Sequence, residues 1–204
     1  MVYGWLLRLR RWRIVIAAAS ITFICSSIWL AFRSGSWLVV NRPHASDLIL
    51  VAAGDEDDRN YWTGIQLLQA GYGRSVLLEV DNTLAPDGIT DIPIAEHFVE
   101  TTTAAKLLPR VTVCSSSEQD EIAYLRSCLR QLSVRSILIV TDEESTRETL
   151  ERFQHYLPEY EWFVVAVNHP EQFGQKWWKH RRWTKSYVQA LQSLLSFEIE
   201  EARR

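Results

Sequence analysis

The uncharged run from Ile14 to Phe32 constrains this chain more than any other feature of its sequence. A helix rises roughly 1.5 Å per residue, so a helix over residues 14–32 would span about 28 Å. That length nearly matches a bilayer core of about 30 Å. The run is therefore predicted to be a transmembrane anchor in contact with the lipid bilayer, flanked by interfacial aromatic residues at Trp12, Trp29 and Trp37.

Two other interpretations of this run stay open. A cleaved signal peptide would end at a small-residue cleavage site, whereas this sequence places Trp29, Phe32 and Trp37 around the end of the run. A buried helix of a soluble domain is disfavoured because the run has no charged face. The transmembrane anchor is therefore the preferred interpretation.

The charges that flank the run predict its orientation. Residues 1–13 form a basic segment that contains Arg8, Arg10, Arg11 and Arg13. The nearest positive charges beyond the run are Arg33 and Arg42. Because the more positive flank stays in the cytoplasm, we expect a single-pass protein of the cell (inner) membrane with a cytoplasmic N-terminus. The rest of the chain is then periplasmic or extracellular.

The part beyond the anchor has the size of one domain. A linker is expected over residues 33–46, where Gly35, Asn41 and Pro43 interrupt regular structure, and an α/β domain over residues 47–204. The chain has 22 Lys and Arg against 25 Asp and Glu; without the four N-terminal arginines the balance is 18 against 25, a net −7. This acidic balance argues against nucleic acid as a partner.

Apolar runs alternate with helical patterns along this domain. The runs are expected to be strands buried on both faces, at residues 48–53, 75–80, 111–114, 136–141 and 162–167. Helical spacing is found at residues 57–70, 94–108, 117–132, 143–156 and around 183–195. The alternation predicts a Rossmann-like three-layer α/β sandwich with a mostly parallel sheet of about five strands, preceded by one transmembrane helix.

The three cysteines do not predict a disulfide framework. Cys25 lies in the anchor, Cys114 is expected to end a strand, and Cys128 is expected about three turns into the following helix. Because that helix returns antiparallel to the strand, the two sulfurs are expected near opposite ends of the layer. A disulfide needs Cα atoms within about 7 Å, so no bridge is expected.

Polar residues follow the predicted strands, and ligands of open α/β sheets bind beyond the carboxyl ends of the strands. The candidate ligand-binding residues are Gly54, Asp55 and Arg59 after the first strand, Ser117 and Glu121 after the third, and Thr141, Asp142 and Arg147 after the fourth. Gly54 would let a ligand approach the backbone, and the helix N-terminus beyond it would hold an anion. In the alternative interpretation, Asp55–Asp58 and Ser115–Ser117 are only helix caps and first-turn carboxylates.

No catalytic residue can be assigned from the sequence. His97 and His155 are expected on helix surfaces, and His169 follows the fifth strand without a nucleophile or carboxylate fixed beside it. No serine–histidine–aspartate order is recognisable. No spacing of histidine and cysteine indicates a metal site.

Residues 176–185 combine three tryptophans with basic residues. One interpretation is a patch on the membrane surface. The favoured interpretation is that Trp177, Trp178 and Trp183 cover the edge of the sheet while the charges are solvated.

The stretch from Asp47 to Val80 resembles the opening of YdcF-like domains, in which a buried strand ends in glycines, an arginine follows, and a helix ends in glycine before a second strand. The counterparts here are Gly54, Arg59, Leu67–Gly71 and Ser75–Val80. Ser115–Glu121 and Ile137–Arg147 resemble the family's serine/threonine–acid segment and its fourth strand end. The resemblance covers most of Asp47–Phe197 through short motifs.

The SanA-like and ElyC-like relatives carry an N-terminal helix and an outward domain, and this chain is similar to them. That group implies a role in the envelope barrier or in peptidoglycan-related biogenesis. YdcF-like domains also imply S-adenosylmethionine as a cofactor, which is disfavoured here because it is scarce outside the cytoplasm; the cofactor is unassigned. Ser145 stands at the position of the family's histidine, and Arg147 lies one position early. A member without catalysis is therefore plausible.

Three hypotheses follow. In the first, the anchored domain binds a small polar or nucleotide-like ligand in envelope maintenance. In the second, it is a non-catalytic interaction module that docks an envelope protein or a lipid surface. In the third, it is a hydrolase or transferase that acts on an envelope intermediate through Asp55 or Asp142, with a metal or base that the sequence does not identify.

Overall fold

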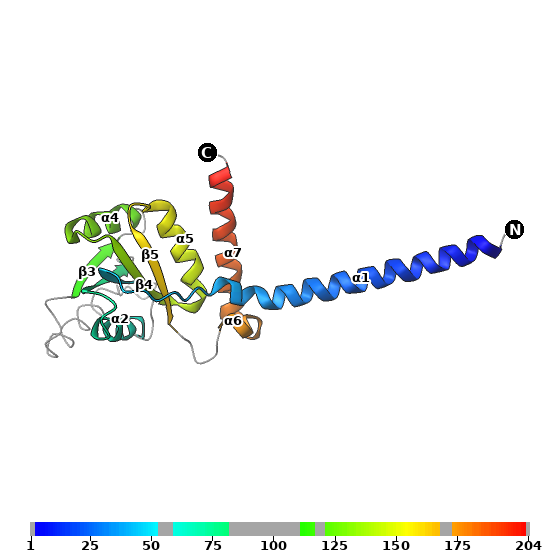
Figure 1. Ribbon diagram of the computed structural model, residues 1–204, viewed down its shortest axis with the longest axis horizontal. Helices are drawn as coiled ribbons and strands as arrows, with labels where there is room; N and C mark the ends of the chain where they lie inside the picture. The colour runs from blue at the N-terminus through cyan, green and yellow to red at the C-terminus, as the bar shows by residue number, and fades with distance from the viewer. Residues whose placement is uncertain (1–2, 53–58, 82–110, 117–120, 168–172, 203–204) are drawn as a thin grey trace.

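The computed structural model describes residues 3–52, 59–81, 111–116, 121–167 and 173–202 (Figure 1). Its helices are α1 (Tyr3–Leu38), α2 (Arg59–Gln69), α4 (Glu121–Leu132), η2 (Glu143–Ser145), α5 (Thr146–Tyr156), α6 (Phe173–Lys176), η3 (Trp177–Lys179) and α7 (Arg181–Ala202). Its strands are β1 (Leu48–Val51), β2 (Ser75–Asp81), β3 (Val111–Ser116), β4 (Ser136–Asp142) and β5 (Glu161–Val167). The helix expected over residues 94–108 lies outside the described residues.

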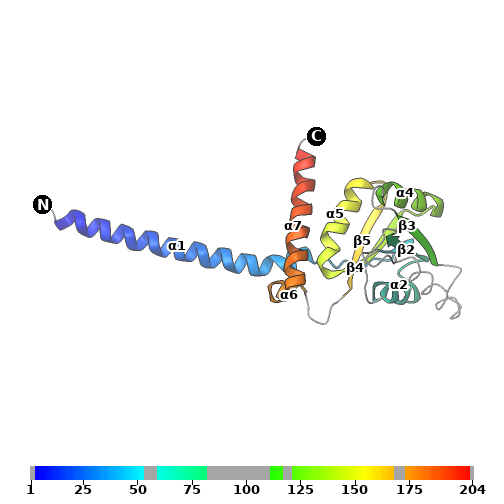
Figure 2. The same ribbon diagram turned by 180° about the vertical axis from the view of Figure 1, so that it is seen from behind.

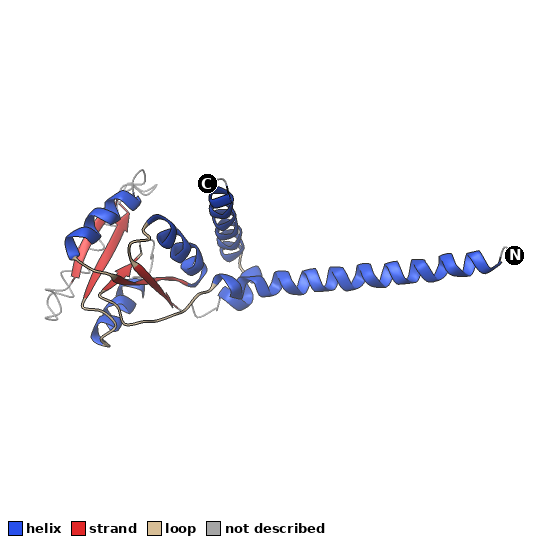
Figure 3. Cartoon of the chain, turned by 45° about the horizontal axis from the view of Figure 1, so that its top comes forward, coloured by secondary structure: helices blue, strands red, loops and turns tan. Residues whose placement is uncertain are grey.

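The five strands form one parallel sheet in the order β3-β2-β1-β4-β5. The register places Val51 of the central strand between Leu78 of β2 and Val140 of β4. Helices cover both faces of the sheet, as Figure 3 shows with strands in red and helices in blue. The predicted Rossmann-like α/β sandwich is therefore confirmed.

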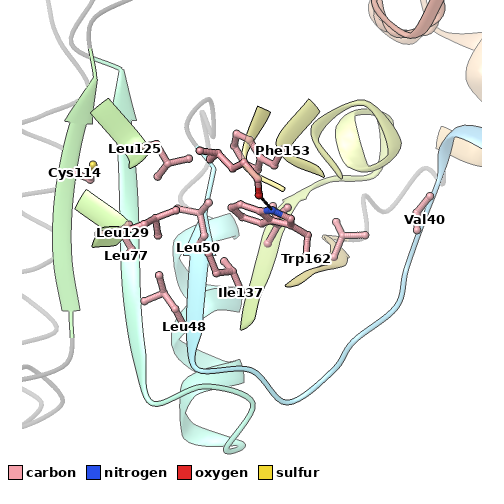
Figure 4. Close-up of a cluster of buried hydrophobic side chains, with 13 residues drawn as sticks. Val40, Leu48, Leu50, Leu77, Cys114, Leu125, Leu129, Ile137, Phe153 and Trp162 are labelled. Carbon is pink, nitrogen blue, oxygen red and sulfur yellow. Dashed lines mark hydrogen bonds between the residues drawn. The ribbon is translucent and has the colours of Figure 1, made fainter. Parts of the chain in front are cut away.

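Alternate residues of β1 supply the two cores of the sandwich. Leu48 and Leu50 pack with α4 and α5 on one face (Figure 4), whereas Ile49 and Val51 pack with α2 on the other. All four side chains are fully buried. Burial of one such side chain stabilises a fold by about 1.5–3 kcal/mol, which explains why the strand reads as a continuous apolar run.

Two glycines fix the position of α2. A Cβ on Gly64 would lie 2.6 Å from Val51 Cγ2, so glycine allows the helix to approach the central strand closely. Gly71 has a φ of +82° and ends the helix as predicted. Its amide donates to Leu68 O, and the amide of Tyr72 donates to Leu67 O, which is the pattern of a glycine-terminated helix.

The N-terminal helix extends further than the sequence predicts. α1 continues through residues 33–38, which were expected to belong to a linker. Its apolar part projects away from the α/β domain (Figures 1 and 2), and side chains such as Ile21, Phe23 and Leu30 are exposed. Among the described residues, Ile16–Leu38 is the one segment long and apolar enough to cross a membrane.

A disulfide joins Cys114 and Cys128, so the expectation of no bridge is wrong. The expectation misplaced two ends: β3 continues to Ser116, and α4 begins only at Glu121. Cys114 therefore lies before the end of its strand, and Cys128 lies two turns into the helix that returns beside it. Both positions are thus at a similar height, with a Cα–Cα distance of 6.5 Å.

The tryptophans of the C-terminal segment do not pack on the sheet, contrary to the favoured interpretation. Trp183 is buried in a third cluster with Leu38 and Phe173, and Trp177 packs against the same cluster. Trp178 is partly exposed, and its ring centroid lies 4.5 Å from that of Phe32. These aromatic side chains therefore fasten the end of α1 to α6 and α7.

Candidate functional site

The strand order places a switch point between β1 and β4. From β1 the chain builds the sheet outward through β2 and β3, and then returns to the other side of β1 with β4 and β5. In sheets of this kind, a crevice forms outside the carboxyl ends of the two strands at which the direction reverses. The candidate site is therefore the end of β4 beside the end of β1.

Two of the predicted residues lie at this point. The amide of Ala52 donates to Val140 O at 3.1 Å, so the pairing of β1 with β4 reaches the level of Thr141. Thr141 is 5% exposed, and Asp142 follows it as the half-buried last residue of β4. The Asp142 side chain makes no capping hydrogen bond to η2.

The start of α2 contributes the next candidate. Arg59 is the first residue of α2 and is half-buried, and the adjacent Asn60 is buried. The helix packs on β1, β2 and β4, and its N-terminus follows the carboxyl end of β1 in the chain. A helix N-terminus with an arginine is suited to an anionic group.

Arg147 contacts the N-terminal helix. Its Nε donates a 2.7 Å hydrogen bond to Trp37 O, and its guanidinium carbon lies 4.2 Å from the centroid of the Trp37 ring. Its Nη1 also pairs with Glu151 Oε1 at 3.2 Å. These contacts hold the guanidinium at the end of α1, so the structure does not bring it together with Thr141 and Asp142.

Thr146 is a residue of this region that the sequence analysis missed. It is fully buried, and its Oγ1 accepts a 2.8 Å hydrogen bond from the amide of Val40. The same hydroxyl lies 3.0 Å from the carbonyl oxygens of Leu38 and Glu143. No local pattern marks this threonine, because its partners Leu38 and Val40 are more than 100 residues away in the chain.

Other predicted residues are described in part or not at all. Gly54, Asp55 and Ser117 lie outside the described residues, as do His97 and His169. Glu121 begins α4, and only its backbone is described. His155 is half-buried on α5, and its ring packs against Tyr156 and Phe197 at centroid distances of 4.8 and 6.2 Å.

Within the described ranges, no group of three or more His, Cys, Asp and Glu side chains is arranged to hold a metal ion. The described candidates are therefore the buried Thr141, the carboxylate of Asp142 and, at the first residue of α2, the guanidinium of Arg59. Such groups bind a small polar ligand through hydrogen bonds and charge.

No family model matches the chain, and no curated protein sequence matches it. Among solved structures, the chain is similar to a protein from the universal stress protein family of Burkholderia pseudomallei. The two chains are 15% identical, and the match covers 58% of this chain and 96% of that one with a TM-score of 0.35. At that TM-score the similarity carries no information on ligand or activity.

Proposed function

We propose that this protein is a single-pass membrane protein whose Rossmann-like domain lies outside the cytoplasmic membrane and binds a small polar or nucleotide-like ligand in envelope maintenance or biogenesis. The observation that carries the proposal is the position of Thr141 and Asp142 at the switch point of the sheet. In open α/β sheets this is the position at which ligands bind.

The disulfide supports the location outside the cytoplasm. Cytosolic thiols are kept reduced, whereas periplasmic and extracellular proteins keep their disulfides. The Cys114–Cys128 bridge joins β3 to α4 in the α/β domain. The basic N-terminal segment, which favours a cytoplasmic N-terminus, leads to the same orientation.

The junction with α1 supports a ligand that is met at the membrane surface. η2 follows directly after Asp142, and Thr146 at its far end bonds to Leu38 and Val40 at the end of α1. The carboxyl end of β4 therefore lies at the end of the domain that adjoins the anchor. A ligand bound there would be a component of the envelope close to the bilayer.

A thermal-shift experiment on the full chain in detergent micelles tests the ligand site. The probes are adenine and uridine nucleotides, soluble cell-wall precursors and S-adenosylmethionine. A bound probe at about 100 times its Kd stabilises the folded state by about 2.7 kcal/mol and raises the Tm. We expect Asp142→Asn to abolish this rise, since it removes the carboxylate charge at the switch point.

Glu161→Gln is the matched control, because Glu161 is an exposed acidic residue at the opposite end of the sheet. It should keep the full rise in Tm. The proposal fails if no probe raises the Tm of the wild-type chain, or if Asp142→Asn responds to the probe as strongly as Glu161→Gln does.

A non-catalytic interaction module is the second candidate function. It is favoured by Arg147, which was expected at the ligand site and instead binds Trp37 and Glu151. The two functions differ in a deletion-complementation assay with Arg59→Ala and Asp142→Ala combined. Loss of complementation by a folded double variant favours the ligand site, whereas full complementation favours the module.

A further inference from the structure

The C-terminal helix α7 is fixed across the end of α1. α7 begins beside the junction of α1 with the domain and runs transverse to α1 (Figures 1 and 2). The hydroxyl of its Tyr187 lies 2.6 Å from Ser34 Oγ, and its Trp183 packs with Leu38. Trp177 packs directly against the backbone of Gly35 and stacks on Tyr187. These contacts fix the start of α7 against the last turns of α1.

One face of α7 is packed and the opposite face is open. The packed face carries Trp183, Ala190 and Leu194, and Phe197 contacts the rings of His155 and Tyr156 on α5. The open face carries exposed residues at helical spacing, which are Arg181, Lys185, Val188, Gln192, Leu195 and Ile199. The three apolar side chains of this stripe are 45%, 60% and 53% exposed.

The apolar part of α1 and the α/β domain lie on opposite sides of α7. α5 is on the domain side of α7, and α1 projects from the other side (Figures 1 and 2). Aromatic residues mark the same level on the anchor. Phe32 and Trp178 are in contact there, and Trp29 lies one turn away beneath the guanidinium of Arg33.

We infer that α7 lies in the membrane–water interface, with Arg181 and Lys185 at the phosphates of anionic phospholipids and Val188, Leu195 and Ile199 at the acyl boundary. This inference rests on the proposed function, because it requires α1 to span the bilayer. An aromatic belt at the end of the apolar run places the interface at the level of Phe32 and Trp178. Basic and apolar residues on one face are the pattern of helices that lie in this interface.

The charges favour lipid over a protein partner for this face. Lys179 at the end of η3 and Arg181 and Lys185 in the first turns of α7 are exposed beside the anchor. The apolar side chains follow further along the helix, and the acidic residues Glu198, Glu200 and Glu201 are confined to its far end. Basic side chains near an anionic surface are attracted to it, and salt screens this attraction. The contact is therefore expected to depend on anionic lipid and on salt.

Environment-sensitive probes on single cysteines test the inference in the full chain. The protein is reconstituted into vesicles of two parts phosphatidylcholine to one part phosphatidylglycerol. Leu195→Cys and Ile199→Cys, each combined with Cys25→Ser, carry a nitrobenzoxadiazole label on the open face. Gln66→Cys in the same background is the control, because Gln66 is exposed on α2 away from the anchor.

We expect the labels at positions 195 and 199 to emit at shorter wavelength than the label at position 66, and to be quenched by lipids with a nitroxide near the headgroup. The shift in emission and the quenching should both weaken in vesicles of pure phosphatidylcholine. They should also weaken in the double variant Arg181→Gln with Lys185→Gln. Arg130→Gln with Arg135→Gln, which removes two exposed charges far from α7, should leave the signal unchanged.

The native Cys25, a free exposed thiol within the apolar run, separates the two proposals. If a label on Cys25 is quenched by lipid while labels on α7 remain aqueous, the inference about α7 is wrong and the anchor stands. If the Cys25 label is also aqueous, both proposals are wrong. Labels on α7 that are shielded from water but not quenched by lipid indicate a protein on this face, and also overturn the inference.

Discussion

The guanidinium carbon of Arg147 lies 4.2 Å from the centroid of the Trp37 ring, and Arg147 Nε donates a hydrogen bond of 2.7 Å to Trp37 O. Trp37 belongs to the last turn of α1, whereas Arg147 is in the first turn of α5. This pair connects the apolar helix to the segment that follows the candidate site. α1 and the sheet are therefore parts of one packed unit.

Replacement of Arg147 by alanine is expected to lower the free energy of unfolding by about 1–2 kcal/mol. The change removes a hydrogen bond from a charged donor and a cation–π contact at a partly exposed ring. Urea unfolding of the full chain in micelles, followed by tryptophan fluorescence, measures the loss. Arg130→Ala is the control, because Arg130 is exposed on α4. Equal losses of stability in the two variants would contradict a stabilising role for the Arg147–Trp37 contacts.

Thr146 offers a sharper test of the same junction. Thr146→Val keeps the shape of the side chain but leaves the buried amide of Val40 without its acceptor, which costs about 1–3 kcal/mol. Thr146→Ser keeps the hydroxyl and removes one methyl group, which costs about 0.8 kcal/mol. Valine should therefore destabilise the chain more than serine in the same unfolding experiment, and the reverse order would exclude a role for the hydroxyl.

The sheet could be predicted because its strands are buried on both faces. Leu48, Leu50 and their neighbours form uninterrupted apolar runs, and Gly71 marks the end of the first helix. The positions of Thr141 and Asp142 at the end of β4 follow from the same pattern. Their role in ligand binding stays a prediction, because spacing alone does not identify a ligand.

The predictions that were wrong for the end of α1 and for the Arg147 side chain have a common physical cause. Helix and strand ends that depend on distant contacts carry no local signal. Ser34 and Gly35 do not favour a helix by themselves, yet Tyr187 and Trp177 hold them in α1. The direction of the Arg147 side chain was inaccessible for the same reason, since its partner Trp37 lies 110 residues earlier in the sequence.

The disulfide leads to a third prediction. Cys114 and Cys128 are separated by 14 residues, and a bridge that closes a loop of about 15 residues stabilises a fold by about 3 kcal/mol in the chain-entropy description. The double variant Cys114→Ala with Cys128→Ala should lose stability of that order in urea unfolding, although two side chains also change.

Thiol counting provides the control for this prediction. Alkylation of the unfolded, unreduced chain should modify Cys25 alone, and prior reduction should expose two further thiols. Cys25→Ser should leave the free energy of unfolding of the domain unchanged, because Cys25 is exposed on α1 and pairs with neither of the other two cysteines. Three reactive thiols in unreduced protein purified from cells would contradict both the Cys114–Cys128 bridge and the proposed location outside the cytoplasm.

Asp47 leads to a prediction about pH. Its Oδ2 accepts hydrogen bonds from the amides of Arg135 and Ser136 at 3.1 and 3.2 Å, and from Ser136 Oγ at 3.2 Å. These backbone hydrogen bonds, with the nearby Arg74, hold the pKa of the carboxyl group below its ordinary value of 3.8, against the opposing effect of burial. The carboxylate therefore ties the start of β1 to the start of β4.

Because the pKa of Asp47 is lower in the folded state, its contribution to stability is complete above the unfolded pKa of 3.8 and is lost as the pH falls through the folded value. Asp47→Asn should therefore lower the free energy of unfolding at neutral pH by roughly 1 kcal/mol, since the amide keeps only part of the hydrogen bonding. The difference from the wild-type chain should shrink below about pH 4. Urea unfolding between about pH 3 and pH 7 measures this difference in the free energy of unfolding. Glu161→Gln is the control, because Glu161 is an exposed carboxylate at the same end of the sheet as Asp47. A difference that does not vary with pH would show that the charge of the Asp47 carboxylate contributes nothing.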